Sequence, residues 1–167
     1  ALMGSNCFLK GYLPVNLSQL TMFNQIYFEG NDEITGPPET GGNLPDEWKD
    51  WQKVYNLQFN NLKKLNSTLP KAWVSGSWQL AFLQLNGCAI HGQLPDEYEN
   101  WTSLTRLSVA NNFLDGPLPR WSAGTTSLNS LDLTSNKFSG DLSNLSFWRL
   151  TKLTSISLSN NQLTGNL

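Results

Sequence analysis

The stretch LSVANNFLDGPLP, residues 107–119, decides the fold of this chain. Its first residues alternate apolar and polar side chains, which is typical of a strand with one buried face. Asn-Asn, a glycine and Pro-Leu-Pro follow, and all of them favour bends. The same ending recurs in LDLTSNKFSGDLS from Leu131 and in ISLSNNQLTGNL from Ile156. Residues 107–119 are therefore one copy of a repeat rather than an isolated strand.

The repeat follows the frame L-x-x-L-x-L-x-x-N-x-L-x-G-x-L-P. Four copies fit it well, and their glycines stand at positions 92, 116, 140 and 165, so successive copies are 24, 24 and 25 residues apart. Two earlier copies, around Ile26 and Leu57, carry one extra residue after the strand, and an insertion near residues 36–42 follows the first of them. Cys7, Leu9 and Gly11 indicate one more turn at the start. We therefore expect about seven turns.

Each position of the frame has a physical role. The L-x-L core forms a short strand, the Asn bonds backbone groups of neighbouring turns, and the Gly permits close packing or a positive φ. A single turn cannot bury its leucines, so the turns must stack. The sequence thus predicts an α/β-type repeat solenoid: a right-handed coil with a parallel concave β-sheet and a convex side of short 3-10, helical or irregular segments. We expect one domain over residues 1–167 that is part of a longer array, because LTGNL ends in mid-repeat.

The frame resembles the leucine-rich repeat, and its period and L-x-G-x-[LI]-P ending are similar to the plant-type class of receptor-kinase ectodomains and polygalacturonase inhibitors. An aromatic residue also follows three residues after the proline in Trp48, Trp73 and Tyr98, and one residue earlier in Trp121. This LPxxW variation resembles kinetoplastid surface antigens and green-algal arrays. The resemblance implies a leucine-rich repeat fold and a non-catalytic role in recognition.

Composition excludes several functions. Charged residues make up only 14% of the chain and the net charge is −2, so the sequence does not favour nucleic acid as a partner. No run of 18 apolar residues predicts a membrane span, and the first residues lack the pattern of a signal peptide. No phosphate loop, metal cluster or nucleophile triad stands out, so we expect neither catalysis nor a cofactor.

A few residues resemble catalytic groups but have simpler explanations. His91 lies between a core position and the repeat glycine, and the frame points it towards solvent. The pairs Asp46-Glu47 and Asp96-Glu97 occupy equivalent positions of different turns, at the expected start of short helical segments. Acidic side chains favour the positive end of a helix dipole, so we interpret both pairs as structural.

The two cysteines, Cys7 and Cys88, both fall in the Asn position of the frame. They are three turns apart, which corresponds to about 15 Å at strand spacing. A disulfide requires Cα atoms within about 7 Å. We therefore predict two free, buried cysteines with a structural role.

Four sequons predict N-glycosylation in a secreted or cell-surface protein. Some sequons arise by chance in a chain this rich in Asn, Ser and Thr, but none of the four lies within an expected strand. The acceptor residues are Asn16, Asn66, Asn100 and Asn144.

The side chains between the strand leucines are expected to face solvent on the concave sheet. Those of the first half are large, whereas the last turn presents only serines. Tyr, Trp and Arg are enriched in binding hot spots, although an ordinary polar sheet without a ligand is the alternative. The candidate binding residues are Tyr27, Gln58, Phe82, Gln84, Arg106 and Asp132. The insertion at 36–42 is a second candidate.

Two functions remain open. The first is an extracellular or cell-surface module for protein or glycan recognition and adhesion, which the low charge, the sequons and the resemblance favour. The alternative is a structural unit of a coat, filament or scaffold that self-associates; it is suggested by the mid-repeat ending LTGNL, because a solenoid needs a capped end or another chain to cover it. The ligand itself does not follow from a repeat fold.

Overall fold

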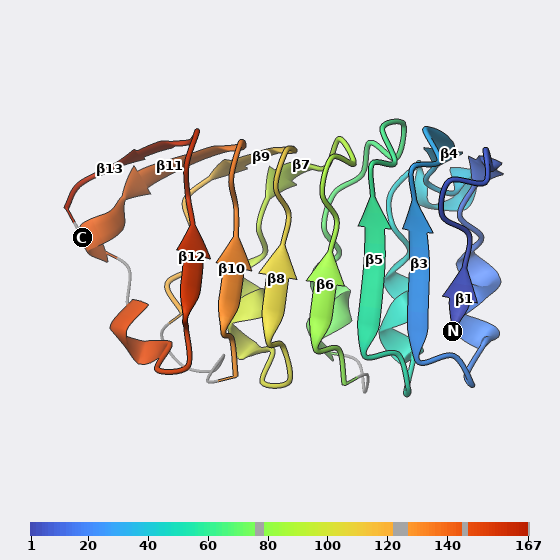
Figure 1. The fold of residues 1–167 in the computed structure, drawn as a ribbon, viewed down its shortest axis with the longest axis horizontal. Helices are drawn as coiled ribbons and strands as arrows, with labels where there is room; N and C mark the ends of the chain where they lie inside the picture. Colours follow the sequence, from blue (N-terminus) through green and yellow to red (C-terminus); the bar gives the residue numbers. More distant parts are fainter. Residues whose placement is uncertain (76–78, 122–126, 145–146, 167) are drawn as a thin grey trace.

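A computed structural model describes residues 1–167 except 76–78, 122–126, 145–146 and 167. Its central feature is a seven-stranded parallel sheet, here called the main sheet, in the order β1-β3-β5-β6-β8-β10-β12. Each turn contributes one strand, and Figure 1 shows the strands side by side with the short helical segments behind them. The strands are Leu2–Met3, Gln25–Glu29, Asn56–Asn60, Phe82–Gln84, Arg106–Ser108, Ser130–Asp132 and Ser155–Ser157. Seven turns around a parallel sheet confirm the predicted solenoid.

The core is a stack of strand leucines. One position of each strand lies in register through the sheet, in Ile26, Leu57, Leu83, Leu107 and Leu131. All five side chains are at most 1% exposed. Full burial of such a side chain stabilises by about 1.5–3 kcal/mol, and each one is buried only because a neighbouring turn covers it.

An Asn at the Asn position links its turn to the one before it. Asn112 Oδ1 accepts the backbone N–H groups of Cys88 at 2.9 Å and Ile90 at 3.0 Å, and its Nδ2 donates to the carbonyl of Leu85 at 2.7 Å. Asn136 repeats the pattern one turn later. The predicted role of the buried amide is thus confirmed, because it satisfies backbone groups that have no strand partner.

The two cysteines are free, as predicted, but only one is buried. The Cys88 thiol donates to the carbonyl of Phe59 at 2.6 Å, and burial raises its pKa to about 12. The prediction that Cys7 is buried is wrong. Cys7 lies in the first turn, where only the second turn packs against it, and its thiol is exposed and bonded to the Ser5 carbonyl at 3.2 Å.

The side behind the main sheet consists of short 3-10 helices, as the sequence predicts. These helices are η1 (Val15–Gln19), η2 (Pro38–Thr40), η3 (Asp46–Asp50), η4 (Lys71–Ser75), η5 (Asp96–Asn100), η6 (Leu142–Asn144) and η7 (Phe147–Arg149). The aromatic residues after Leu-Pro are buried there. Trp73 Nε1 donates to the Pro45 carbonyl of the preceding turn at 2.9 Å, and Tyr98 donates to Pro70 at 3.3 Å. These rings therefore fill the core and also bond adjacent turns.

Trp48 is the centre of an aromatic cluster in the second and third turns. Its ring stacks on Trp51 at 4.8 Å and on Trp73 at 6.2 Å between centroids, and it meets Phe59 edge-on at 5.7 Å. Leu62 takes the Asn position in the third turn and supplies no side-chain bond there. Packing of large rings thus contributes stability where the amide ladder is interrupted.

A second set of parallel strands, which the repeat frame does not predict, runs along one flank; Gly92, Gly116 and Gly140 lie in it, and Gly165 directly follows its last strand. One group is β7 (His91–Gln93), β9 (Phe113–Gly116), β11 (Lys137–Asp141) and β13 (Gln162–Thr164), and the other is β2 (Lys10–Tyr12) with β4 (Glu33–Thr35). Gly92, Gly116, Gly140 and Gly165 all have positive φ, as expected for this position. After the Asn position, the backbone of each of these turns runs parallel to that of the adjacent turn and bends near the glycine.

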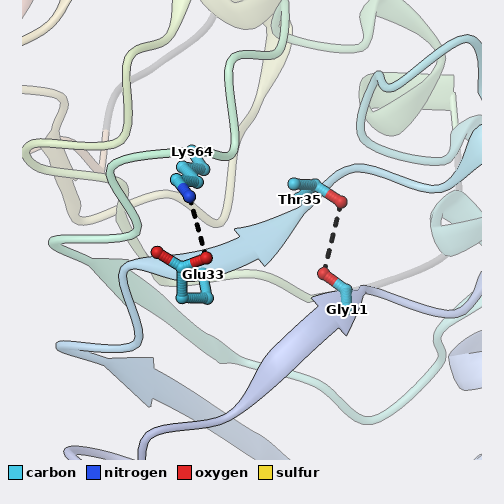
Figure 2. Close-up of polar contacts among 4 residues, drawn as sticks. All are labelled: Gly11, Glu33, Thr35 and Lys64. Carbon is cyan, nitrogen blue, oxygen red and sulfur yellow. Dashed lines mark hydrogen bonds and ion pairs between the residues drawn. The ribbon is translucent and has the colours of Figure 1, made fainter.

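Polar contacts tie the first three turns together along this flank. Thr35 Oγ1 donates to the Gly11 carbonyl at 3.2 Å, and Lys64 lies 2.8 Å from Glu33, as Figure 2 shows. Both partners of the ion pair are more than half exposed, so the pair contributes little stability.

The insertion forms a compact loop around η2. Gly41 adopts the left-handed conformation that ends this helix. A Cβ on Gly36 would lie 1.6 Å from the carbonyl oxygen of Gly42, so the loop closes on itself at Gly36. Within the described residues, no helix has the length and apolarity to cross a bilayer.

Candidate binding face

The main sheet brings the six candidate binding residues onto one surface. Strand pairing places Tyr27 beside Gln58 and Gln58 beside Gln84 in one row, which continues through Ser108 to Asp132. A parallel row places Phe82 beside Arg106. The binding face is defined here as these six residues, Tyr27, Gln58, Phe82, Gln84, Arg106 and Asp132. It crosses strands β3 to β10.

Hydrogen bonds between side chains hold the part of this face over β3 and β5. Asn56 Nδ2 donates to the hydroxyl oxygen of Tyr27 at 2.9 Å, and Gln58 Nε2 donates to Asn56 Oδ1 at 3.0 Å. Gln25 Nε2 donates to the hydroxyl oxygen of Tyr55. Two aromatic hydroxyls and three amides are therefore fixed in orientation before any partner arrives.

This network leaves bonding capacity that points away from the pairs already made. The hydroxyl of Tyr27 still has its own hydrogen to donate, and Gln58 still has its carbonyl oxygen. Burial raises the pKa of Tyr27, and the neighbouring Tyr55 raises it further to a smaller extent. Tyr27 is therefore a neutral phenol at physiological pH. Within the described part of the chain, the side chain of Gln84 makes no hydrogen bond.

The part of the binding face over β8 and β10 has fewer side chains that hydrogen bonds hold in place. Asp132 Oδ1 accepts the backbone N–H of Thr134 at 3.1 Å, so it is partly used in the fold. Arg106 is exposed, and its strand neighbours are Phe82 and Ser130. Strands β10 and β12 carry mainly serine at the outward positions. The large and pre-oriented groups therefore lie over β3, β5 and β6.

The repeat frame does not reveal Tyr55, whose hydroxyl accepts the bond from Gln25 beside this network. Tyr55 directly precedes β5, at a position that Ala81 and Thr105 occupy in the next two turns. A tyrosine among small residues at equivalent positions is the signal that identifies it. Asn56 is recognised as a residue of the sheet, but its central role follows only from its two hydrogen bonds.

The insertion borders a surface groove between the second and third turns, lined by none of the six residues of the binding face. Its lining residues are Thr40, Asn43, Leu44, Asp46, Glu47, Thr68 and Pro70. Asn43 Oδ1 accepts both the backbone N–H and the hydroxyl of Thr68, at 3.1 and 3.0 Å. These contacts explain how the loop is held, and the groove is a second candidate contact region.

Two of the acidic residues that resemble catalytic groups, Asp46 and Asp96, line one groove, whereas His91 is not among its lining residues. Asp46 and Asp96 begin η3 and η5 in different turns, as predicted, and Lys71, which also lines the groove, lies 3.6 Å from Glu97. His91 lies in β7 on the flank. Within the described residues, no group of three or more His, Cys, Asp or Glu side chains could hold a metal.

The sequon asparagines lie away from the main sheet. Asn16 is in η1, Asn100 ends η5, and Asn66 is in the flank of the third turn, all three exposed. The side chain of Asn144 lies outside the described part. Glycans on the three described positions would leave the binding face open.

Comparisons with known proteins agree with this architecture. The family described as Leucine rich repeat matches residues 102–163. The chain is 30% identical over 157 residues to Receptor-like protein 7 of Arabidopsis thaliana. The aligned residues make up 93% of this chain but only 15% of that protein. The chain therefore spans a small part of the curated relative that it matches.

Two solved structures show the same fold. The leucine-rich repeat ectodomain of the receptor kinase SOBIR1 from Arabidopsis thaliana has a TM-score of 0.60 at 20% identity, over 99% of this chain and 72% of that one. The Arabidopsis receptor kinase HAESA, in complex with the peptide hormone IDA and the co-receptor SERK1, has a TM-score of 0.57 at 18% identity, over 95% of this chain and 29% of that one. These matches show leucine-rich repeats in residues 102–163 and the leucine-rich repeat fold over the described chain. The plant-type and LPxxW assignments stay predictions.

Proposed function

We propose that this chain is a non-catalytic recognition module that works outside the cell, and that its partner binds the main sheet over β3, β5 and β6. The observation that carries the proposal is the network of Tyr27, Asn56 and Gln58, whose side chains are bonded to one another on the outer side of the sheet. Such a network fixes polar groups in advance and so lowers the entropy lost on binding.

The relatives support this proposal. HAESA, of the same fold, is described in complex with a peptide hormone and a co-receptor. The matched relative is named a receptor-like protein. A protein partner or a glycan is consistent with the surface, whereas its scarcity of positive charge disfavours nucleic acid.

The proposal is tested with labelled, secreted chain and an extracellular matrix preparation from the source organism. We expect saturable binding that Gln58→Ala combined with Gln84→Ala weakens at least about tenfold, which is about 1.4 kcal/mol. Lys152→Ala is the matched control, because Lys152 is exposed and lies outside the main sheet. Equal binding by the wild type and the double variant would place the contact elsewhere.

Glycosylation belongs to the same proposal. We expect Asn16, Asn66 and Asn100 to accept N-linked glycans in the secretory pathway, because all three are exposed and off the main sheet. Asn144 is proposed from its sequon alone. Treatment of the native protein with a glycosidase should lower its mass, and an unchanged mass would contradict an extracellular location with used sequons.

A structural assembly unit is the second candidate, favoured by exposed apolar residues in and after the first turn. Met3, Phe8 and Met22 are 68%, 90% and 76% exposed. Apolar surface of this kind favours association between molecules. Light scattering decides: concentration-dependent growth that Phe8→Ser abolishes supports assembly, and a stable monomer argues against it.

A further inference from the structure

The chemistry of strands β3, β5 and β6 narrows the class of ligand. The outward side chains of these three strands include a single charged residue, Glu29, among seven other polar or aromatic ones, and the remaining apolar residues pack in the core. A ligand that carried many charges would lose their hydration and meet only one cation of the binding face, Arg106 on the adjacent strand β8. The surface therefore fits an uncharged ligand that is rich in hydrogen-bonding groups.

The polar groups on this surface both donate and accept. Tyr27 accepts from Asn56 and keeps its hydroxyl hydrogen, Gln58 donates to Asn56 and keeps its carbonyl oxygen, and Gln84 keeps both functions. Sugar hydroxyls likewise donate and accept at the same atom. The unused donors and acceptors of Tyr27, Gln58 and Gln84 can therefore bond the hydroxyl groups around a hexose ring.

Aromatic rings occupy neighbouring turns at the same surface. Tyr27 lies on β3, Tyr55 directly precedes β5, and Phe82 lies on β6, and all three are half-buried. Aromatic side chains combine apolar area with a polar edge, which suits the C–H faces of sugar rings. Neighbouring strands are about 4.8 Å apart, roughly the advance of one sugar in an extended β-linked chain.

We propose that the ligand of the main sheet is a neutral, extended β-linked polysaccharide that crosses β3, β5 and β6, with about one sugar unit over each strand. This inference rests on the proposed recognition function and specifies its ligand. Phe82 and Tyr27 pack against sugar faces, and Gln58 and Gln84 bond the hydroxyls between them. The carboxylate of Glu29 excludes acidic polysaccharides from the same path.

Calorimetric titration of the secreted chain tests the proposal, with cellohexaose and chitohexaose as neutral probes and hexagalacturonic acid as the acidic one. We expect saturable binding of at least one neutral probe and none of the acidic probe. Phe82→Ala and, separately, Gln84→Ala should each weaken binding at least about tenfold. Ser155→Ala, on the distant strand β12, is the matched control and should bind like the wild type.

Gln84→Ala keeps the test decisive if Phe82→Ala folds poorly, because the Gln84 side chain makes no bond within the described chain. Failure of both neutral probes to bind overturns the proposal, as does equal binding by Gln84→Ala. Selection from a displayed peptide library distinguishes failure of the polysaccharide proposal from failure of the proposed recognition function. Peptides selected by the wild type and lost with Gln58→Ala would overturn the sugar ligand and support recognition at this face, whereas peptides unaffected by that change would count against both.

Discussion

The substitution Asn112→Ala tests the internal ladder that holds the turns together. The amide of Asn112 is 5% exposed and accepts two backbone N–H groups of the preceding turn, from Cys88 and Ile90. Alanine leaves both donors buried without a partner. Each such group costs about 1–3 kcal/mol, so we predict a loss of about 2–6 kcal/mol in the free energy of unfolding.

The assay combines urea denaturation with hydrogen exchange of individual amides. Stability in a repeat protein is distributed between neighbouring turns, so the amides of Cys88 and Ile90 should lose protection more than those of the first two turns. Asn129→Ala is the matched control. Asn129 is exposed, and its loss should change stability by less than about 0.5 kcal/mol.

A result for Asn112→Ala no larger than that for Asn129→Ala, with Cys88 and Ile90 still protected, would refute the reasoning. In that case the backbone groups would find other partners, and the Asn position would not hold the turns.

Three further predictions follow from the core and the insertion. Cys7 should react with a thiol reagent in the native protein, whereas Cys88 should react only on unfolding, and equal rates would contradict its burial. Burial raises the pKa of Cys88 to about 12, so above about pH 8.5 the thiol ionises in the unfolded state but not in the folded one. The stability contributed by the Cys88 thiol is therefore complete below about pH 8.5 and falls by about 1.4 kcal/mol per pH unit towards pH 12. Cys88→Ala should remove that share of the slope in alkaline denaturation, and an unchanged slope would assign it to other groups such as Tyr98, whose pKa burial also raises. Gly36→Ala should destabilise by about 1–3 kcal/mol in thermal or urea denaturation, because its Cβ meets the Gly42 carbonyl, whereas Gly41→Asn should be tolerated in its left-handed conformation.

The regular part of the fold follows from spacing alone. Leu107 and Leu131 are 24 residues apart and pair in adjacent strands, so the register is contained in the period. The positive φ of Gly116 and the burial of Asn112 follow from the frame in the same way. Such positions are predictable because each turn meets the same neighbours.

The irregular part depends on contacts between turns that spacing does not reveal. Asn31, only 1% exposed, plays the ladder role in the second turn, and it stands five residues after Ile26 as Asn112 stands five after Leu107, so the frame could have identified it. Cys7 is exposed because one side of its turn has no neighbour in the structure. The binding face could be predicted from the alternation of the strands, whereas the bonds among Tyr27, Asn56 and Gln58, and the bond of Gln25 to Tyr55, become apparent only in the structure.

The most direct test of the central claim is nuclear magnetic resonance mapping of the chain with its bound partner. We predict that the perturbed signals belong to the main sheet over β3, β5 and β6, with Tyr27, Gln58, Phe82 and Gln84 among the largest changes. Perturbations confined to the groove around Asn43 and Thr68, with the main sheet unchanged, would contradict the claim.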